Sequence, residues 1–150
     1  IRGHQFNKVE MVQYTTEDQS DAAFEELVGK AERLVQELGL HYRLSKLAAG
    51  DCSFSMARTY DIEVWIPSMG IYKEVSSASN ARDYQARRGN VKYRGADKKL
   101  HLAHTLNASG LATSRVIPAI VEQYQNDDGS VTVPEVLRPY LGIDRIEKQR

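Results

Sequence analysis

The chain opens with the stretch Ile1-Arg2-Gly3-His4-Gln5-Phe6-Asn7-Lys8-Val9-Glu10. Side chains of an extended strand alternate between its faces, so residues 2, 4, 6, 8 and 10 share one face. That face carries three charged groups, an imidazole and one aromatic ring, whereas a strand that covers a core presents apolar side chains. A solvated surface strand is the alternative, but it gains little from an aromatic ring. A nucleotide site uses every member: a base stacks on Phe6, phosphates meet Arg2 and Lys8, and an amine or hydroxyl meets Glu10.

Length and composition describe one globular domain. The chain has 150 residues, of which 41% are hydrophobic and 27% are charged, enough for a single core. Its 20 basic and 20 acidic side chains cancel, so contact with nucleic acid must come from local patches. No apolar run approaches the roughly 20 residues of a membrane helix, and we expect no membrane partner. The single Cys52 excludes an internal disulfide and a cysteine-cluster zinc site, which favours a cytoplasmic location.

Hydrophobic periodicity predicts an α+β fold in which helices flank an antiparallel sheet. The expected strands are 3–14, 41–49, 59–66, 71–78 and 101–108, and the expected helices are 20–38 and 110–124. In the strand 59–66, one face carries Tyr60, Ile62, Val64 and Ile66, and the other carries Asp61, Glu63 and Trp65. We interpret the basic run 82–99 as a solvated surface, and we expect residues 144–150 to fray.

A carboxylate and a run of hydroxyls follow the turn at residues 67–70. The stretch reads Tyr72-Lys73-Glu74-Val75-Ser76-Ser77-Ala78-Ser79-Asn80. Such oxygen ligands can hold a magnesium ion beside a triphosphate. A serine-rich edge strand that leads into a turn is the alternative.

A strand that gives way to a helix through small residues is the third candidate. It reads His104-Thr105-Leu106-Asn107-Ala108-Ser109-Gly110-Leu111-Ala112-Thr113-Ser114-Arg115. Small residues let a ligand approach the backbone, and Arg115 near the helix start can present a planar guanidinium to a phosphate. An arginine on the helix surface is the alternative. His101 and His104 lack a third ligand nearby, so we expect no metal site there.

Together these segments resemble the class II aminoacyl-tRNA synthetases in their seryl form. The opening stretch is similar to the second strand of motif 2, and residues 104–115 are similar to motif 3. The stretch 74–88 resembles the family's Glu-Val-Ser-Ser…Asn…Gln-Ala-Arg-Arg block, and residues 128–140 resemble its C-terminal signature. The resemblance implies a partial class II catalytic core: residues 1–150 form a single domain, the C-terminal portion of the catalytic domain. Motif 1 and the tRNA-binding arm would precede residue 1.

The resemblance implies a serine–tRNA ligase that activates L-serine with ATP and Mg²⁺ and transfers it to tRNA(Ser), as a homodimer in its complete form. The implied catalytic residues are Arg2, Lys8, Glu74 and Arg115. The implied ATP-binding residues are Phe6, Glu74, Val75, Ser76, Ser77 and Arg115. The metal would be held by Glu74 and Ser77, which strict alternation puts on opposite faces, so the strand should bulge between them. The serine-binding residues would be Asn107, Ser109 and Glu10, with Glu10 a buried carboxylate that rejects alanine.

Several residues depart from the family pattern. Ala108 and Ser114 stand where the family has glycine, and Pro118 should kink the last helix. The departures motivate an alternative, a non-catalytic paralogue or fragment that acts as a nucleotide- or adenylate-binding module. A truncated piece or one half of a split enzyme is a further possibility, and the isolated chain is then expected to be weakly active or inactive. Without a partner strand, the edge at residues 3–14 is open to self-association.

Overall fold

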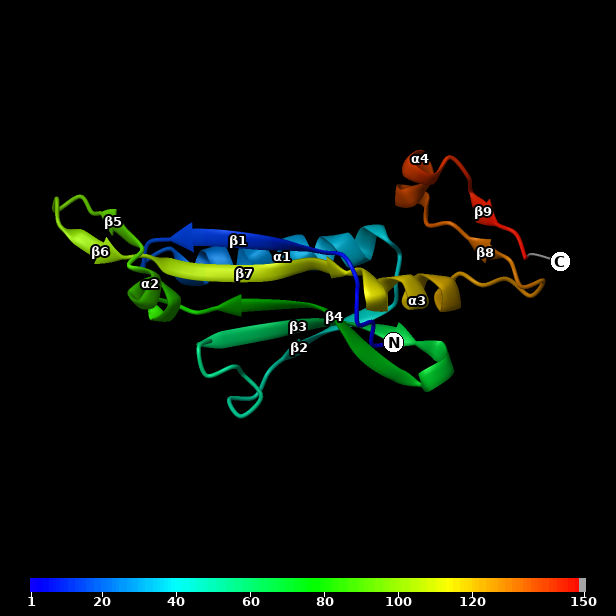
Figure 1. The fold of residues 1–150 in the computed structure, drawn as a ribbon, viewed down its shortest axis with the longest axis horizontal. Helices are drawn as coiled ribbons and strands as arrows, with labels where there is room; N and C mark the ends of the chain where they lie inside the picture. The colour runs from blue at the N-terminus through cyan, green and yellow to red at the C-terminus, as the bar shows by residue number, and fades with distance from the viewer. Residues whose placement is uncertain (149–150) are drawn as a thin grey trace.

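The computed structural model describes residues 1–148, and it contains a five-stranded antiparallel sheet with the order β1-β7-β4-β3-β2. Figure 1 shows these strands side by side. Their bounds are β1 Lys8–Thr15, β2 Tyr42–Lys46, β3 Arg58–Ile66, β4 Ile71–Asn80 and β7 His104–Ala112. Helices α1, Ser20–Glu37, and α3, Thr113–Gln123, flank the sheet, which confirms the predicted α+β class.

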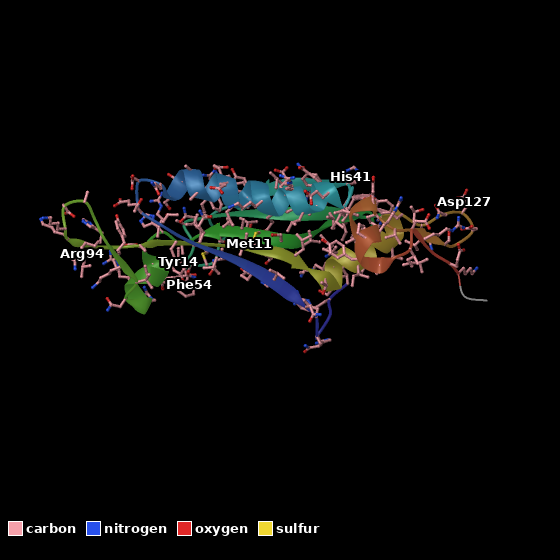
Figure 2. The ribbon with its side chains drawn as sticks, turned by 90° about the horizontal axis from the view of Figure 1, so that it is seen from above. Met11, Tyr14, His41, Phe54, Arg94 and Asp127 are labelled. Carbon is pink, nitrogen blue, oxygen red and sulfur yellow. The ribbon has the colours of Figure 1, made fainter. Side chains whose placement is uncertain are left out.

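Helix α1 lies along one face of the sheet (Figure 2). Its apolar residues recur at steps of three and four, and the left-handed backbone at Gly39, with φ of 67°, follows its end. Phe24 and Val35 are fully buried, and they belong to the same core cluster as Leu106 of β7 and Ile62 of β3. Helix α3 joins the same core. The hydroxyl of Tyr124, just after α3, donates to the carbonyl of Leu38, at 2.8 Å.

The opposite face of the sheet is polar. On β3 the predicted alternation is confirmed, because Ile62, Val64 and Ile66 are at most 1% exposed while Asp61 and Glu63 are only partly buried. On β7, likewise, Leu106 and Ala108 enter the core, and the residue between them lies on the other face. The uncovered face therefore carries the polar side chains of the central strands.

Several predicted boundaries are wrong, and two of them change how the first strand and the last helix are placed. Strand β1 begins at Lys8, so residues 1–7 lead into the sheet and the alternation predicted for Arg2, His4 and Phe6 does not apply. Strand β7 extends to Ala112, because Glu10 and Lys8 pair with its last residues, and α3 starts three residues later than expected. Strand β1 is an edge of the sheet, as predicted, and it leaves apolar side chains exposed: Val9 by 65%, Val12 by 58% and Tyr14 by 62%.

Short elements fill the ends of the molecule (Figure 1). The polar segment 79–100, for which no helix was predicted, contains α2, Tyr84–Gly89, and the strand β5, Lys92–Arg94, which pairs with β6, Leu100–Leu102. At the other end lie η1 Pro67–Met69, β8 Val131–Thr132, η2 Glu135–Leu137, α4 Arg138–Leu141 and β9 Arg145–Ile146. The pairing of β9 with β8 corrects the expectation that residues 144–148 fray, while residues 149–150 lie outside the described part. Within residues 1–148, no helix combines the length and hydropathy that a membrane span needs.

Candidate active site

A cavity of about 180 Å³ gathers predicted residues from four parts of the chain. We call it the arginine cavity, and it is lined by Arg2, Gly3, Phe6, Lys8, Glu74, Val75, Ser109, Ala112, Ser114 and Arg115. The N-terminal segment comes close to the start of α3, where a Cβ added to Gly3 would lie 3.0 Å from the Cβ of Ser114. This close approach brings Arg2 and Phe6 to the cavity although neither belongs to a strand.

Arg115 and Glu74 form an ion pair at the wall of the arginine cavity. An Nη1 hydrogen of Arg115 points to the backbone carbonyl of Glu74, at 2.7 Å, and the same nitrogen lies 3.3 Å from its carboxylate. The side chains are 25% and 42% exposed, so the pair itself adds little stability. Its effect is geometric, because the carbonyl contact fixes the guanidinium in the first turn of α3 and directs its charge toward the cavity.

Lys8, Glu10 and Ser109 form a second polar group beside the first. The ammonium of Lys8 lies 2.8 Å from the carboxylate of Glu10 and donates to the hydroxyl of Ser109, at 3.1 Å. That hydroxyl donates in turn to Glu10, at 3.3 Å. The Glu10 side chain is 35% exposed, so the expectation of a buried carboxylate is wrong in this chain. The reason is that β1 is an edge strand, which has a neighbouring strand on one side only among residues 1–148.

A β-bulge in β4 creates a second cavity of about 400 Å³, which we call the carboxylate cavity. Ile62 pairs with Ser76 and Glu63 pairs with Glu74, so Val75 is an extra residue on β4. This bulge confirms the one expected between Glu74 and Ser77, and both residues line the cavity. Its full lining is Leu47, Asp51, Ser53, Thr59, Asp61, Glu74, Ser77 and Ser79. Because Glu74 lines both cavities, the two are neighbours.

Asp61 lies in the carboxylate cavity, although it was not among the predicted site residues. Partial burial raises the pKa of this carboxyl, and the nearby charges of Glu74 and Glu63 raise it further. The hydroxyl of Ser77 and the charge of Arg115 act in the opposite direction and lower the pKa. The Oδ1 atom is buried and has no hydrogen-bond partner among the described residues. The signal was present in the sequence, since the polar face of 59–66 was predicted to carry Asp61.

The carboxylate cavity suits a hard cation that a ligand partly coordinates. Its polar lining consists only of carboxylates and hydroxyls, the oxygen donors that Mg²⁺ prefers. Residues 1–148 contain no group of three or more His, Cys, Asp or Glu placed to bind a metal ion together. Mg²⁺ is commonly held by one or two carboxylates with phosphate oxygens and water, so the donors present fit this role better than a closed metal cage.

Three predicted residues have little or no side-chain surface in the two cavities. Asn107 is half-buried on the same face as Ser109 but lines neither cavity. Val75 is 1% exposed, because most of its side chain lies in the core, although it is among the residues that line the arginine cavity. Ser76 is also 1% exposed, and its hydroxyl donates to the carbonyl of Ser109, at 2.6 Å. The side chain of Ser76 therefore binds the neighbouring strand, and its contact with ATP stays a prediction.

A larger cavity lies elsewhere and contains no predicted residue. It measures about 530 Å³ and lies beside α2 and the β5–β6 hairpin, where Arg82 and His104 line it with acidic residues. Arg87 in the basic run pairs with Asp83, as expected of a solvated surface. Figure 2 shows this end of the molecule, marked by Arg94, at the far side from Asp127. Volume alone is thus a poor guide to the site in this fold.

Comparisons with known proteins agree on one family. A family model for the tRNA synthetase class II core domain (G, H, P, S and T) matches residues 1–124. The chain is 71% identical over 147 residues to serine–tRNA ligase 2 of Clostridium acetobutylicum, and 57% identical over 146 residues to the serine–tRNA ligase of Thermosipho melanesiensis. Each match covers 97% of this chain but only 35% and 34% of the relative. The chain therefore spans about a third of the length of these curated relatives.

Solved structures give the same result. The seryl-tRNA synthetase of Pyrococcus horikoshii complexed with ATP superposes with a TM-score of 0.95 at 43% identity, over 99% of this chain and 34% of that one. The cytoplasmic serine–tRNA ligase of Naegleria fowleri in complex with AMP gives 0.90 at 39% identity, over 99% of this chain and 36% of that one. The fold is thus that of a partial class II catalytic core.

Proposed function

This chain belongs to the class II tRNA synthetase core domain family, and on that premise we propose that it carries part of the active site of a serine–tRNA ligase. The observation that carries the proposal is the arginine cavity, which joins Arg2 and Phe6 to Arg115 and Glu74. The chain is similar to serine–tRNA ligases, and two of the similar structures were solved with ATP or AMP, which supports the seryl assignment.

The reaction has two steps in the complete enzyme. The serine carboxylate attacks the α-phosphorus of ATP, a new oxygen–phosphorus bond forms, and pyrophosphate leaves. A ribose hydroxyl at the end of tRNA(Ser) then attacks the carbonyl carbon of seryl-adenylate, and AMP leaves. Neither step requires a nucleophile from the protein, so this chain contributes orientation and charge stabilisation.

The arginine cavity accounts for ATP. Phe6 is 42% exposed at its wall, which leaves a ring face on which adenine can stack. Arg2, Lys8 and Arg115 supply the positive charge that a phosphate chain needs. Arg115 is the best oriented of the three, because the carbonyl and carboxylate of Glu74 both hold its guanidinium. Charge fixed in position before the reaction stabilises the developing charge without reorganisation.

The carboxylate cavity accounts for Mg²⁺. We assign Glu74 and Ser77 as its protein ligands, because the bulge puts both in a cavity with only oxygen donors. When bound with ATP, the cation would neutralise phosphate charge. Glu74 lines both cavities, so its carboxylate can serve the cation while its carbonyl holds Arg115.

We assign serine recognition to the group formed by Lys8, Glu10 and Ser109, which lies at the start of β1. Glu10 and Ser109 are register partners, and they present a carboxylate and a hydroxyl beside the ammonium of Lys8. A carboxylate can accept a hydrogen bond from the serine hydroxyl, which alanine lacks. Asn107 lies further along the same face of β7, about 7 Å from Ser109. The complete enzyme would then act on L-serine and tRNA(Ser) in the cytoplasm, as a homodimer.

Ligand-induced stabilisation tests the proposal. The melting temperature of the chain is measured with a non-hydrolysable seryl-adenylate analogue and with the alanyl analogue. An analogue at about 100 times its dissociation constant stabilises by about 2.7 kcal/mol, which is roughly 5–10 °C for a domain of this size. Only the seryl analogue should give this rise.

Matched arginine variants define the site in the same assay. Arg115→Ala should abolish the rise, whereas Arg33→Ala, which removes an exposed arginine of α1 paired with Glu37, should keep it. Equal responses to both analogues would contradict serine specificity. No response at all would contradict a formed site in this chain and favour the alternative of a fold fragment without ligand binding. Pyrophosphate exchange by the complete protein would exclude the non-catalytic paralogue.

A further inference from the structure

We propose that Asp61 is a positioning residue that accepts a hydrogen bond from the Ser77 hydroxyl and so turns the Ser77 oxygen toward the metal bound with ATP. The inference rests on the proposed function and deepens it, because it assigns a role to a residue that neither the sequence motifs nor the comparisons select. Asp61 would act through Ser77 and would not itself contact the reacting atoms.

The sheet register brings the two residues together. Asp61 on β3 and Ser77 on β4 are direct partners in the antiparallel ladder. Side chains of such partners lie on the same face with Cβ atoms about 4.5–5.5 Å apart. Both line the carboxylate cavity, and Glu74 reaches the same cavity because of the bulge at Val75. If Glu74 and Ser77 both bind one metal ion, Asp61 therefore lies next to the ligand Ser77 on the neighbouring strand.

The chemistry of a neutral hydroxyl ligand explains why a neighbouring carboxylate is needed. A serine oxygen that coordinates a cation must point its lone pairs at the cation and its hydrogen elsewhere. A hydrogen-bond acceptor on the far side fixes this orientation, and such partners commonly change metal affinity 10- to 100-fold. Asp61 has a buried Oδ1 with no other hydrogen-bond partner among the described residues, so it has an acceptor to offer.

The surroundings favour Asp61 over the other carboxylate of β3. Glu63 is already held by Arg43, with 2.5 Å between the guanidinium Nε and the carboxylate. Glu74, across the bulge, is held by Arg115. Asp61 has no ion pair among residues 1–148, and Ser77 is both its partner in the ladder and its neighbour in the carboxylate cavity. Of these three carboxylates, Asp61 is therefore the one that is available to accept a hydrogen bond from Ser77.

Binding of Mn²⁺·ATP and of metal-free ATP provides the test, with Mn²⁺ as a paramagnetic probe for Mg²⁺. Titration calorimetry measures both affinities, and electron paramagnetic resonance measures bound Mn²⁺ directly. Asp61→Ala should weaken Mn²⁺·ATP about 10-fold or more and leave metal-free ATP unchanged. Asp61→Asn keeps an acceptor oxygen and should recover part of the loss. Glu63→Gln, the matched control, removes a charge from the same strand and should bind like the unmodified chain.

A double-mutant cycle distinguishes positioning from direct coordination. If Asp61 acts through Ser77, adding Asp61→Ala to Ser77→Ala should cause no further loss. Independent, additive losses would overturn the proposal and indicate that Asp61 binds the metal itself. Equal weakening of metal-free ATP, or unchanged Mn²⁺·ATP affinity in Asp61→Ala, would also overturn it. Failure of the unmodified chain to bind Mn²⁺·ATP would instead overturn the proposed function, and the inference with it.

Discussion

Ser76 and Ser77 are neighbours in the chain with opposite surroundings, and replacing each by alanine should separate stability from ligand binding. The hydroxyl of Ser76 is buried and donates to the carbonyl of Ser109, at 2.6 Å. Strands β4 and β7 are register partners only from Ala78 to Asn80 on β4. The Ser76 bond therefore joins the two strands beyond their paired segment, at the end that carries the site.

The magnitude follows from burial. Ser76→Ala removes a buried donor and leaves the Ser109 carbonyl without it, which costs about 1–3 kcal/mol. For a chain of this length each kcal/mol lowers the melting temperature by about 2–4 °C, so we expect a loss of about 2–12 °C. Ser77 faces the carboxylate cavity. Ser77→Ala should change stability by about 0.5 kcal/mol at most, yet weaken Mn²⁺·ATP about 10-fold or more.

Urea unfolding monitored by circular dichroism measures the first effect, and titration calorimetry with Mn²⁺·ATP measures the second. Ser45→Ala on β2 serves as the control for removal of a half-buried hydroxyl outside both cavities. A Ser76→Ala variant that unfolds like the unmodified chain would refute the structural role of the Ser76 hydroxyl. A larger loss of stability in Ser77→Ala than in Ser76→Ala would refute it as well, because the bulge would then lie at another residue.

Three further predictions concern specificity, pH and association. In the complete enzyme Glu10→Ala should raise the KM for serine about 10- to 100-fold, the value of a hydrogen bond to a charged group, and change that for ATP little; equal losses would contradict the assignment. The hydroxyl and backbone N–H of Ser130, together with Arg145, lower the pKa of Asp128 from 3.8 to about 2. Its contribution to stability is therefore complete above about pH 4 and is lost as the pH falls toward 2, so the difference in unfolding free energy between the chain and Asp128→Asn should disappear over this interval. Val12→Lys should reduce self-association at high concentration in sedimentation measurements, because Val12 is 58% exposed on the edge strand β1; a chain that is already monomeric would refute this.

Local patterns predicted the central part of the fold well. The alternation in β3 and the three-to-four spacing in α1 depend on neighbours only a few residues away. In both elements, the apolar side chains recur on the face that is buried in the core. The bulge in β4 was predicted from the resemblance to seryl-tRNA synthetases, which implies that Glu74 and Ser77 serve one ligand. The structure contains it, with Val75 as the extra residue.

Features that depend on distant contacts could not be predicted. Ser109 and Gly110 look like the small residues before a helix, but pairing with β1 keeps them extended as part of β7. The segment 79–100 looks like a polar loop, but bonds such as that from Thr105 to Gln85, at 2.7 Å, hold short elements in place. The exposure of Glu10 depends on strand order, which no residue near Glu10 encodes.

The candidate metal ligands depend for their position on a residue that has no polar group. Val75 is 1% exposed in the core, and it is the residue that the bulge adds to β4. Burial of its side chain anchors the bulge, and the bulge puts Glu74 and Ser77 on one cavity. In a regular strand these two residues, three apart, would lie on opposite faces, and the ligands would be divided between the core and the open face. The apolar core therefore does more than stabilise the sheet: by fixing the bulge, it determines which oxygen atoms can bind the same cation.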